Sequence, residues 1–155
     1  MVSLHRKQSG FTIVELLIVI IVIGILATLV LVTFTGVQQK ARNTQRQTDI
    51  KAVASHLETY NANNAMYPTT ANMNDASNPT WVSQNLKGLD RESTRDPSDK
   101  NNVYTFAASS TSQQYGYAPT KDDGTACDNT AGNECTKFTL TYTLEGGVQQ
   151  SVKNL

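Results

Sequence analysis

Residues 16–32 read LLIVIIVIGILATLVLV, and positions 16–34 contain no charged residue. The wider stretch of residues 11–34 holds twenty-four residues and a single charge, that of Glu15. As a helix it extends about 36 Å, since each residue adds about 1.5 Å, and this crosses the roughly 30 Å hydrocarbon core of a bilayer with some tilt. The sequence therefore predicts a membrane-spanning helix over residues 11–34.

A short basic segment, MVSLHRKQSG (residues 1–10), precedes this helix. It differs from an ordinary secretory signal, because the apolar run that follows it is longer than the usual range of about 7–15 residues and no convincing small-x-small cleavage site comes after that run. The small residue Gly10 lies before the apolar run instead. Processing at Gly10 would therefore leave the helix in the mature protein.

Glu15 is the acidic residue within the predicted span. A carboxylate in an apolar segment costs a few kcal/mol unless it is paired or reaches the interface. One interpretation is that Glu15 lies near the helix start and reaches water among the lipid headgroups. The other is that cleavage after Gly10 creates an amine on Phe11, four residues away, whose positive charge compensates a carboxylate in a low-dielectric setting.

The string SGFTIVELLIVIIVIGILATL (residues 9–29) closely resembles the class III signal and N-terminal helix of type IV pilins and pseudopilins. The resemblance implies cytoplasmic cleavage between Gly10 and Phe11 by a prepilin peptidase and N-methylation of Phe11. It also implies an assembly contact in which Glu15 of one subunit meets the Phe11 amine of a neighbour. Gly24 matches the family's helix-weakening glycine, whereas Val32 stands where many members carry a proline, a departure that bears on how far the helix unwinds.

The orientation of the span is also implied by the resemblance. Arg6 and Lys7 precede the span, and Lys40, Arg42 and Arg46 follow it, so the count of basic residues does not favour a cytoplasmic N-terminus.

A second helical segment continues the first, over residues 35–63, and begins a predicted head domain of residues 35–155. Residues 38–48 contain one apolar residue, Ala41, so we expect this part to be solvated rather than packed. Beyond it, apolar residues recur at helical spacing and predict a face packed on a sheet. These residues are Ile50, Val53, Ala54, Leu57 and Tyr60.

The rest of the predicted head consists of a connecting loop (residues 64–102) and a sheet region (residues 103–155). The loop is rich in Thr, Asn, Asp, Ser and Pro, with a short helix expected after Pro79. Alternating or β-rich runs predict strands, of which KFTLTYTLE is the clearest. The expected strands are residues 103–107, 115–118, 137–145 and 148–152. The fold class is therefore α+β, a long N-terminal helix on a small antiparallel sheet of three or four strands, as in the type IV pilin fold.

Two cysteines, Cys127 and Cys135, bracket the polar loop DNTAGNE. In an exported domain this spacing favours a disulfide over a redox or metal site, and the resemblance agrees, because many pilins close a C-terminal surface loop in this way. Four acidic residues crowd the same region. They are Asp122, Asp123, Asp128 and Glu134. A solvated acidic loop is the simpler interpretation, and calcium is the alternative, which some pseudopilins bind in this part of the fold, although no EF-hand spacing is present.

Composition and motifs argue against several functional classes. Thirteen basic and thirteen acidic residues give no net charge, which weighs against nucleic-acid binding by the monomer. No nucleophile elbow, phosphate-binding loop, dinucleotide fingerprint or metalloprotease helix occurs, and after cleavage His56 is the remaining histidine. We therefore expect a protein that is not an enzyme and needs no cofactor.

The resemblance implies a structural subunit of a type IV pilus, or fimbrium, polymerised into a helical surface filament that serves adhesion, motility or DNA uptake. Chain size and the disulfide loop favour this interpretation, with residues 109–135 as a candidate adhesive surface. The alternatives are a pseudopilin of a type II secretion or competence system and a membrane-tethered binding module that does not polymerise. The implied partners are copies of the chain, a prepilin peptidase, an assembly platform and, indirectly, an assembly ATPase. The implied location is the inner membrane before assembly and the cell surface after it.

Overall fold

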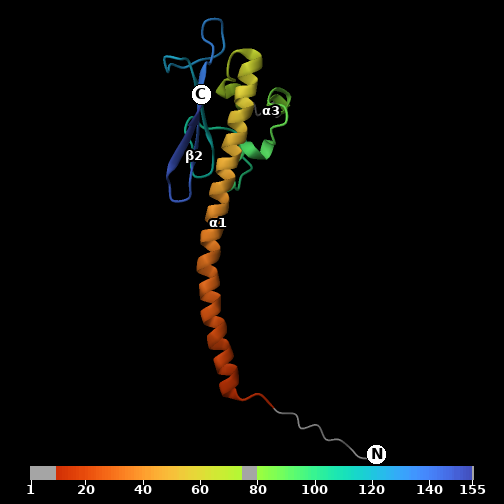
Figure 1. Cartoon of the computed structure of the whole chain (residues 1–155), viewed down its shortest axis with the longest axis vertical. Helices are drawn as coiled ribbons and strands as arrows, with labels where there is room; N and C mark the ends of the chain where they lie inside the picture. The colour runs from red at the N-terminus through yellow and green to blue at the C-terminus, as the bar shows by residue number, and fades with distance from the viewer. Residues whose placement is uncertain (1–9, 75–79, 155) are drawn as a thin grey trace, which may run out of the picture. The chain divides into compact units, whose positions relative to one another are not determined.

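The computed structural model describes residues 10–74 and 80–154, with the backbone alone at Leu31, Val32 and Thr80. The predicted leader, apart from Gly10, lies outside the described residues. The elements in chain order are the helices α1 (Ile13–Asn64), α2 (Thr70–Met73) and α3 (Thr80–Asn85), the 3-10 helix η1 (Arg91–Thr94), and the strands β1 (Gly116–Thr120), β2 (Lys137–Thr143) and β3 (Gln149–Lys153). Figure 1 shows the strands beside the later part of α1. The chain has the predicted α+β, pilin-like fold.

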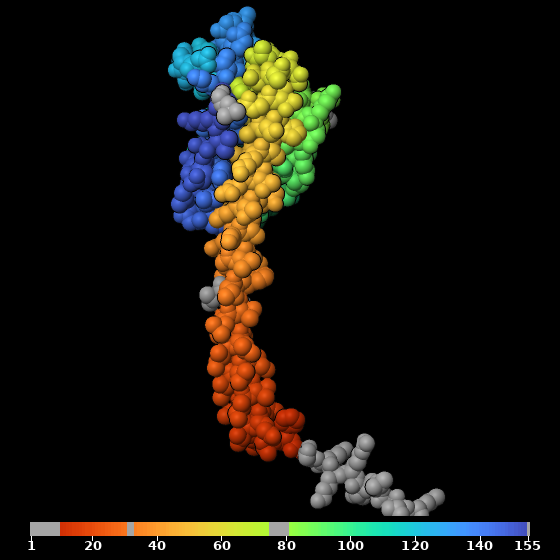
Figure 2. Space-filling model, in the orientation of Figure 1, coloured from red at the N-terminus to blue at the C-terminus, as the bar shows by residue number. Residues whose placement is uncertain are grey.

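The chain divides into two compact units, of which the first ends at Gln38. Its described part is helical from Ile13 onward, and its large apolar side chains are exposed, from 48% at Val22 to 87% at Ile13. In Figure 2 the described residues of this unit are coloured red to orange. The most apolar 18-residue window of α1 has a mean hydropathy of 3.2, so by length and composition the helix is able to cross a membrane.

The second unit has a core between α1 and the sheet. Ile50, Val53 and Leu57 of α1 are fully buried, as their helical spacing predicts. On β2 the buried side chains alternate with partly exposed threonines, which is the pattern of a strand with one face on a core. The sheet is antiparallel in the order β1-β2-β3, with Leu140 of β2 opposite Tyr117 of β1 and Val152 of β3.

The strand predicted at residues 103–107 is wrong. The segment makes one isolated parallel bridge, Ala107 to Gly116, and is otherwise irregular. Side chains take the place of a neighbouring strand here. The amide of Asn74 bonds both backbone groups of Phe106, accepting from its N–H at 2.6 Å and donating to its carbonyl at 2.7 Å. The backbone polar groups are thus satisfied without a ladder.

The connecting region of residues 64–102 is more regular than predicted. It contains α2 and η1 in addition to the expected short helix α3. Thr69 and Asn72 form a capping box at the start of α2, each side chain accepting from the backbone N–H of the other.

The expectation of a solvated segment at residues 38–48 is wrong at Arg46, which is 1% exposed. Its guanidinium makes two hydrogen bonds to Asp96, of 2.8 and 3.0 Å, and Asp96 is itself 1% exposed. Ser98 and Asn43 accept further bonds from it, and Glu145 lies 3.4 Å away while also accepting from Arg42 at 2.6 Å. Charged pairing therefore attaches this part of α1 to the rest of the unit where apolar residues are lacking.

One helical turn after Arg46, Asp49 is also buried, at 3% exposure. It accepts hydrogen bonds from Gln45 at 2.7 Å and from the Tyr115 hydroxyl at 2.9 Å. Burial raises the pKa of Asp49 above its usual range and the charges of Asp96 and Asp90 add to the rise, whereas the two hydrogen bonds oppose it. The ionised form of Asp49 is therefore a cost to the fold.

We expect Asp96→Asn to lower the free energy of unfolding by about 3 kcal/mol, because it removes the nearer and more deeply buried of the two carboxylates that pair with the Arg46 guanidinium. Denaturant titration of the full chain in micelles, followed by fluorescence of the single tryptophan Trp81, measures this change. The double variant Arg46→Met/Asp96→Leu should recover most of the loss. Asp122→Asn, which alters an exposed pair with Lys137 at 3.7 Å, is the control and should change nothing measurable. A loss from Asp96→Asn no larger than that of the control would contradict the prediction.

We expect Asp49→Asn to be more stable than the wild type at neutral pH, because the amide keeps both hydrogen bonds after rotation of Gln45 and removes a buried charge. A carboxyl whose folded pKa is raised stabilises the fold below its unfolded pKa of about 3.9, and this contribution is lost as the pH rises through the folded pKa. The advantage of the variant should therefore grow from about pH 4 upward and vanish at lower pH. Unfolding titrations at several pH values test this, and a wild type that is the more stable protein at pH 7 would refute it.

Candidate functional site

The start of α1 brings Thr12 and Glu15 into direct contact. Oε2 of Glu15 accepts a hydrogen bond from the Thr12 backbone N–H at 2.8 Å and another from the Thr12 hydroxyl at 2.6 Å. The Glu15 backbone N–H in turn donates to the Thr12 hydroxyl at 3.2 Å. This reciprocal arrangement is a capping box, which satisfies N–H groups that the first turn of a helix leaves unpaired.

The capping box explains how a carboxylate is held in the first turn of an apolar helix. The acid lies at the end of the helix where the macrodipole is positive, and two donors share its charge. Phe11 precedes it and is 82% exposed, and Gly10 is exposed as well. The structure thus brings together Gly10, Phe11 and Glu15, the residues singled out in the sequence, at one end of the helix.

Thr12 is the member of this cluster that sequence reasoning missed. The T-x-x-E spacing of a capping box is present at positions 12–15 and could have identified it. We name these four residues, Gly10, Phe11, Thr12 and Glu15, the N-terminal cluster.

Gly24 lies within the continuous helix α1. A Cβ added at Gly24 would meet nothing within 4 Å among the residues described, so the packing of the chain itself gives no reason for glycine here. The Thr28 hydroxyl bonds the carbonyl of Gly24 at 3.2 Å and that of Ile25 at 2.8 Å. The role of Gly24 in weakening the helix stays a prediction.

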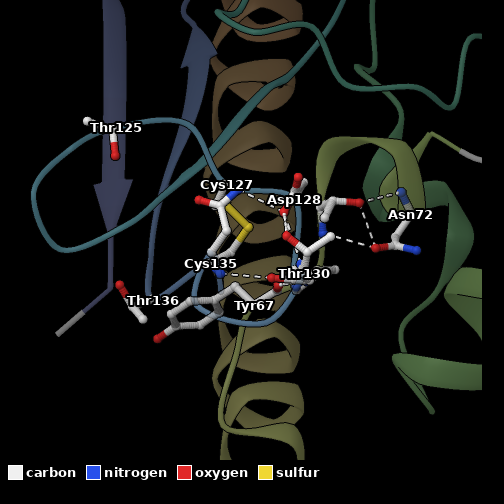
Figure 3. The surroundings of a disulfide bond; sticks show 12 residues. Tyr67, Asn72, Thr125, Cys127, Asp128, Thr130, Cys135 and Thr136 are labelled. Atoms are coloured by element: carbon white, nitrogen blue, oxygen red, sulfur yellow. Dashed lines mark hydrogen bonds between the residues drawn. A yellow bond between two sulfur atoms is a disulfide. The ribbon is translucent and has the colours of Figure 1, made fainter.

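The second region singled out in the sequence is the loop closed by Cys127 and Cys135, which form the expected disulfide (Figure 3). Cys135 is fully buried, and its carbonyl accepts a hydrogen bond from the Tyr67 N–H at 2.7 Å. Asn129, at a φ of 61°, donates from its side chain to the Tyr67 carbonyl at 2.9 Å and accepts from the Cys135 N–H at 2.8 Å. The loop is therefore fastened to the segment that follows α1.

The acidic residues around this disulfide are engaged in local turns. Asp123 accepts bonds from Thr125, Asp128 from Thr130 and Asn133, and Glu134 from the Gly132 N–H. These hydrogen bonds lower the pKa values of the three carboxyls. The fourth, Asp122, lies 3.7 Å from Lys137. Within residues 10–74 and 80–154, no group of three or more His, Cys, Asp or Glu residues could hold a metal ion.

Comparison with known proteins supports the N-terminal cluster as the recognisable part of the chain. Residues 5–31 match the family described as the prokaryotic N-terminal methylation motif. The type II secretion system core protein G of Dickeya chrysanthemi is 40% identical over 67 residues, which cover 43% of this chain and 44% of that protein.

Two further relatives carry the same description. The core protein G of Pseudomonas aeruginosa is 35% identical over 97 residues, 63% of this chain and 60% of the relative. That of Vibrio cholerae is 42% identical over 65 residues, 42% of this chain and 44% of the relative. The chain thus spans about half the length of the curated relatives it matches. No solved structure matches it.

The chain thus carries the prokaryotic N-terminal methylation motif on an α+β, pilin-like fold, in which a long apolar helix is followed by a three-stranded antiparallel sheet.

Proposed function

We propose that this chain is a pseudopilin, a subunit that leaves the membrane to polymerise into the helical filament of a type II secretion type of system. The observation that carries the proposal is the apolar first unit of the chain. It exposes its apolar side chains, and the N-terminal cluster lies where its helix begins. The relatives favour a secretion pseudopilin over the surface pilus subunit that the sequence alone suggested first.

The physical route from membrane to filament follows from the exposed apolar helix. In lipid its side chains are already out of water, so packing against the same helix of other subunits changes little apolar burial. A head-to-tail contact that does not close into a ring repeats as a helical filament. The filament core is then made of α1 segments from many copies.

Glu15 sets the register of that core. Cleavage of the Gly10–Phe11 peptide bond frees an amine on Phe11, and N-methylation leaves it able to carry a positive charge. Both Thr12 bonds reach the same carboxylate oxygen, Oε2, and no described residue bonds Oε1 of Glu15. We assign Oε1 to the Phe11 amine of the neighbouring subunit, a charged pair that a low-dielectric core strengthens.

The partners of this cycle are other copies of the chain, a prepilin peptidase, an assembly platform in the inner membrane and, indirectly, an assembly ATPase. The apolar helix fits anchoring in that membrane before assembly. The role is structural and uses no catalytic residue.

A type IV pilus subunit is the second candidate, and the disulfide loop favours it. The loop exposes Asp128 and Thr130, as expected of a contact surface within residues 109–135. Deleting the gene distinguishes the two candidates, because a pseudopilin is needed for the release of secreted proteins and a pilus subunit for surface filaments and attachment.

We expect Glu15→Ala to insert into the membrane normally and to reduce sheared filaments at least about tenfold, since the buried amine of the neighbour loses its counter-charge. Quantitative blotting of sheared and membrane fractions measures both quantities. Thr28→Val is the matched control, because the Thr28 hydroxyl bonds only carbonyls of its own helix among the described residues. Normal filament yield from Glu15→Ala would rule out the assigned contact.

Intact mass and N-terminal sequencing of the filament fraction test the processing step. We expect a chain that begins with methylated Phe11, lacks the ten-residue leader and is two hydrogens lighter because of the Cys127–Cys135 disulfide. An unprocessed chain confined to membranes would replace the filament proposal with the tethered binding module.

A further inference from the structure

A hollow lies beside the C-terminal part of α1. It has a volume of about 240 Å³ and is lined by His56, Thr59 and Asn63 of α1 and by Asn85, Leu86 and Lys87 at the end of α3. Figure 2 shows the yellow end of α1 and the green segment that contains α3 side by side. We name this feature the α1–α3 hollow.

The two walls of the hollow are held in place by packing next to it. Tyr60 of α1 and Trp81 of α3 lie with ring centroids 5.8 Å apart, and Leu86 is buried in the core. The chain then turns through Gly88, at a φ of 87°, with a hydrogen bond from the Leu89 N–H to the Leu86 carbonyl. The hollow is therefore formed by the fold itself rather than by a bound partner.

The hollow offers both acceptor atoms and N–H donors, and His56 supplies one of the acceptors. His56 Nδ1 lies 2.9 Å from the Ala52 carbonyl, which only accepts, so in the neutral ring Nδ1 carries the hydrogen and Nε2 is an acceptor. Gly88 is the neighbour of this nitrogen, since a Cβ at position 88 would lie 3.7 Å from Nε2, in ordinary van der Waals contact.

The neighbouring polar side chains each have one donor engaged, and the amides of Asn63 and Asn85 keep a second N–H. The Asn63 amide donates to the Thr59 carbonyl at 2.9 Å, the Asn85 amide to the Trp81 carbonyl at 2.9 Å and the Thr59 hydroxyl to the Ser55 carbonyl at 3.0 Å. In the described part of the chain no hydrogen bond reaches the side-chain oxygens of Asn63 and Asn85. The one cationic group of the lining is the ammonium of Lys87.

This set of groups selects among ligand classes. An anion such as phosphate would meet one cation and two amide N–H groups but also several acceptor atoms that repel it, and an organic cation would be repelled by Lys87. A transition metal would find one imidazole nitrogen and no carboxylate or thiolate in the lining. A sugar ring fits instead, because each of its hydroxyls both donates and accepts, and so pairs with the acceptor atoms, the amide N–H groups and the Lys87 ammonium.

We propose that the α1–α3 hollow binds one neutral saccharide unit. The volume is below the range of about 300–1,000 Å³ typical of sites for drug-sized ligands, which suits a single ring rather than an enclosed chain. A filament would repeat the site along its length, so weak single contacts would add up on a surface that displays many saccharides. The binding itself needs no assembly.

The test uses the full, processed chain labelled with ¹⁵N in phosphocholine micelles, because sugar-headed detergents would compete. Methyl glucoside, methyl galactoside and N-acetylglucosamine are titrated separately to about 100 mM, a range that covers millimolar dissociation constants. We expect amide shifts at His56, Asn63 and Lys87 that saturate with at least one sugar. Shifts confined to other residues, or none with any of the three sugars, overturn the proposal.

Two single variants and a matched control complete the test. Asn63→Ala and Lys87→Ala should each weaken binding about threefold to tenfold, the effect of one lost hydrogen bond. Asn64→Ala removes an equivalent bond, from its amide to the Tyr60 carbonyl at 2.8 Å, but alters no residue of the lining and should leave the affinity unchanged. Equal weakening by Asn63→Ala and Asn64→Ala overturns the proposal. Shifts at the same residues with sodium phosphate or ammonium chloride but not with the sugars also overturn it.

Discussion

The first unit of the chain exposes its large apolar side chains among the residues described. The rest of the structure and its proposed function depend on this exposure. From Ile13 to Leu26 these side chains are 48 to 87% exposed among the residues described. At about 25 cal/mol per Å² of apolar surface, such a helix is not stable in water and needs lipid or other helices around it. Glu15 is the single charge within residues 11–34. The energy of an assembly of such helices therefore depends on which group of a neighbouring helix lies beside this carboxylate.

The second unit is stabilised by other means, because α1 has few apolar residues where that unit begins. Arg46 pairs with Asp96 and Glu145 from distant parts of the chain. The apolar stripe that packs in the core begins four residues later, at Ile50. Replacing a buried ion pair with apolar residues is often neutral, whereas removing one partner alone is strongly destabilising. In a small unit with a three-stranded sheet, such pairing and the Cys127–Cys135 disulfide supplement a limited core.

Local sequence patterns predicted the helices and strands whose burial repeats along the chain. They failed where side chains from distant positions satisfy the backbone or pair with a charge. The alternation through Phe138 and Leu140 identified β2, because burial on one face of a strand repeats every second residue. Residues 103–107 have similar composition, but Asn74, thirty-two positions from Phe106, takes its backbone groups. The burial of Arg46 depends on partners 50 and 99 positions away and has no local signature. Thr12, in contrast, has a local signature, the T-x-x-E spacing to Glu15.

The capping box also bears on how the assembly contact would form. A free glutamate side chain samples many rotamers, and fixing it against a neighbour costs conformational entropy. In this chain Thr12 already holds Oε2 through two hydrogen bonds, so that part of the cost is met by the folding of the helix. The remaining oxygen, Oε1, keeps acceptor capacity for a charged donor. Thr12 is thus a positioning residue in the proposed mechanism, and the intramolecular cap and the contact between subunits support each other instead of competing.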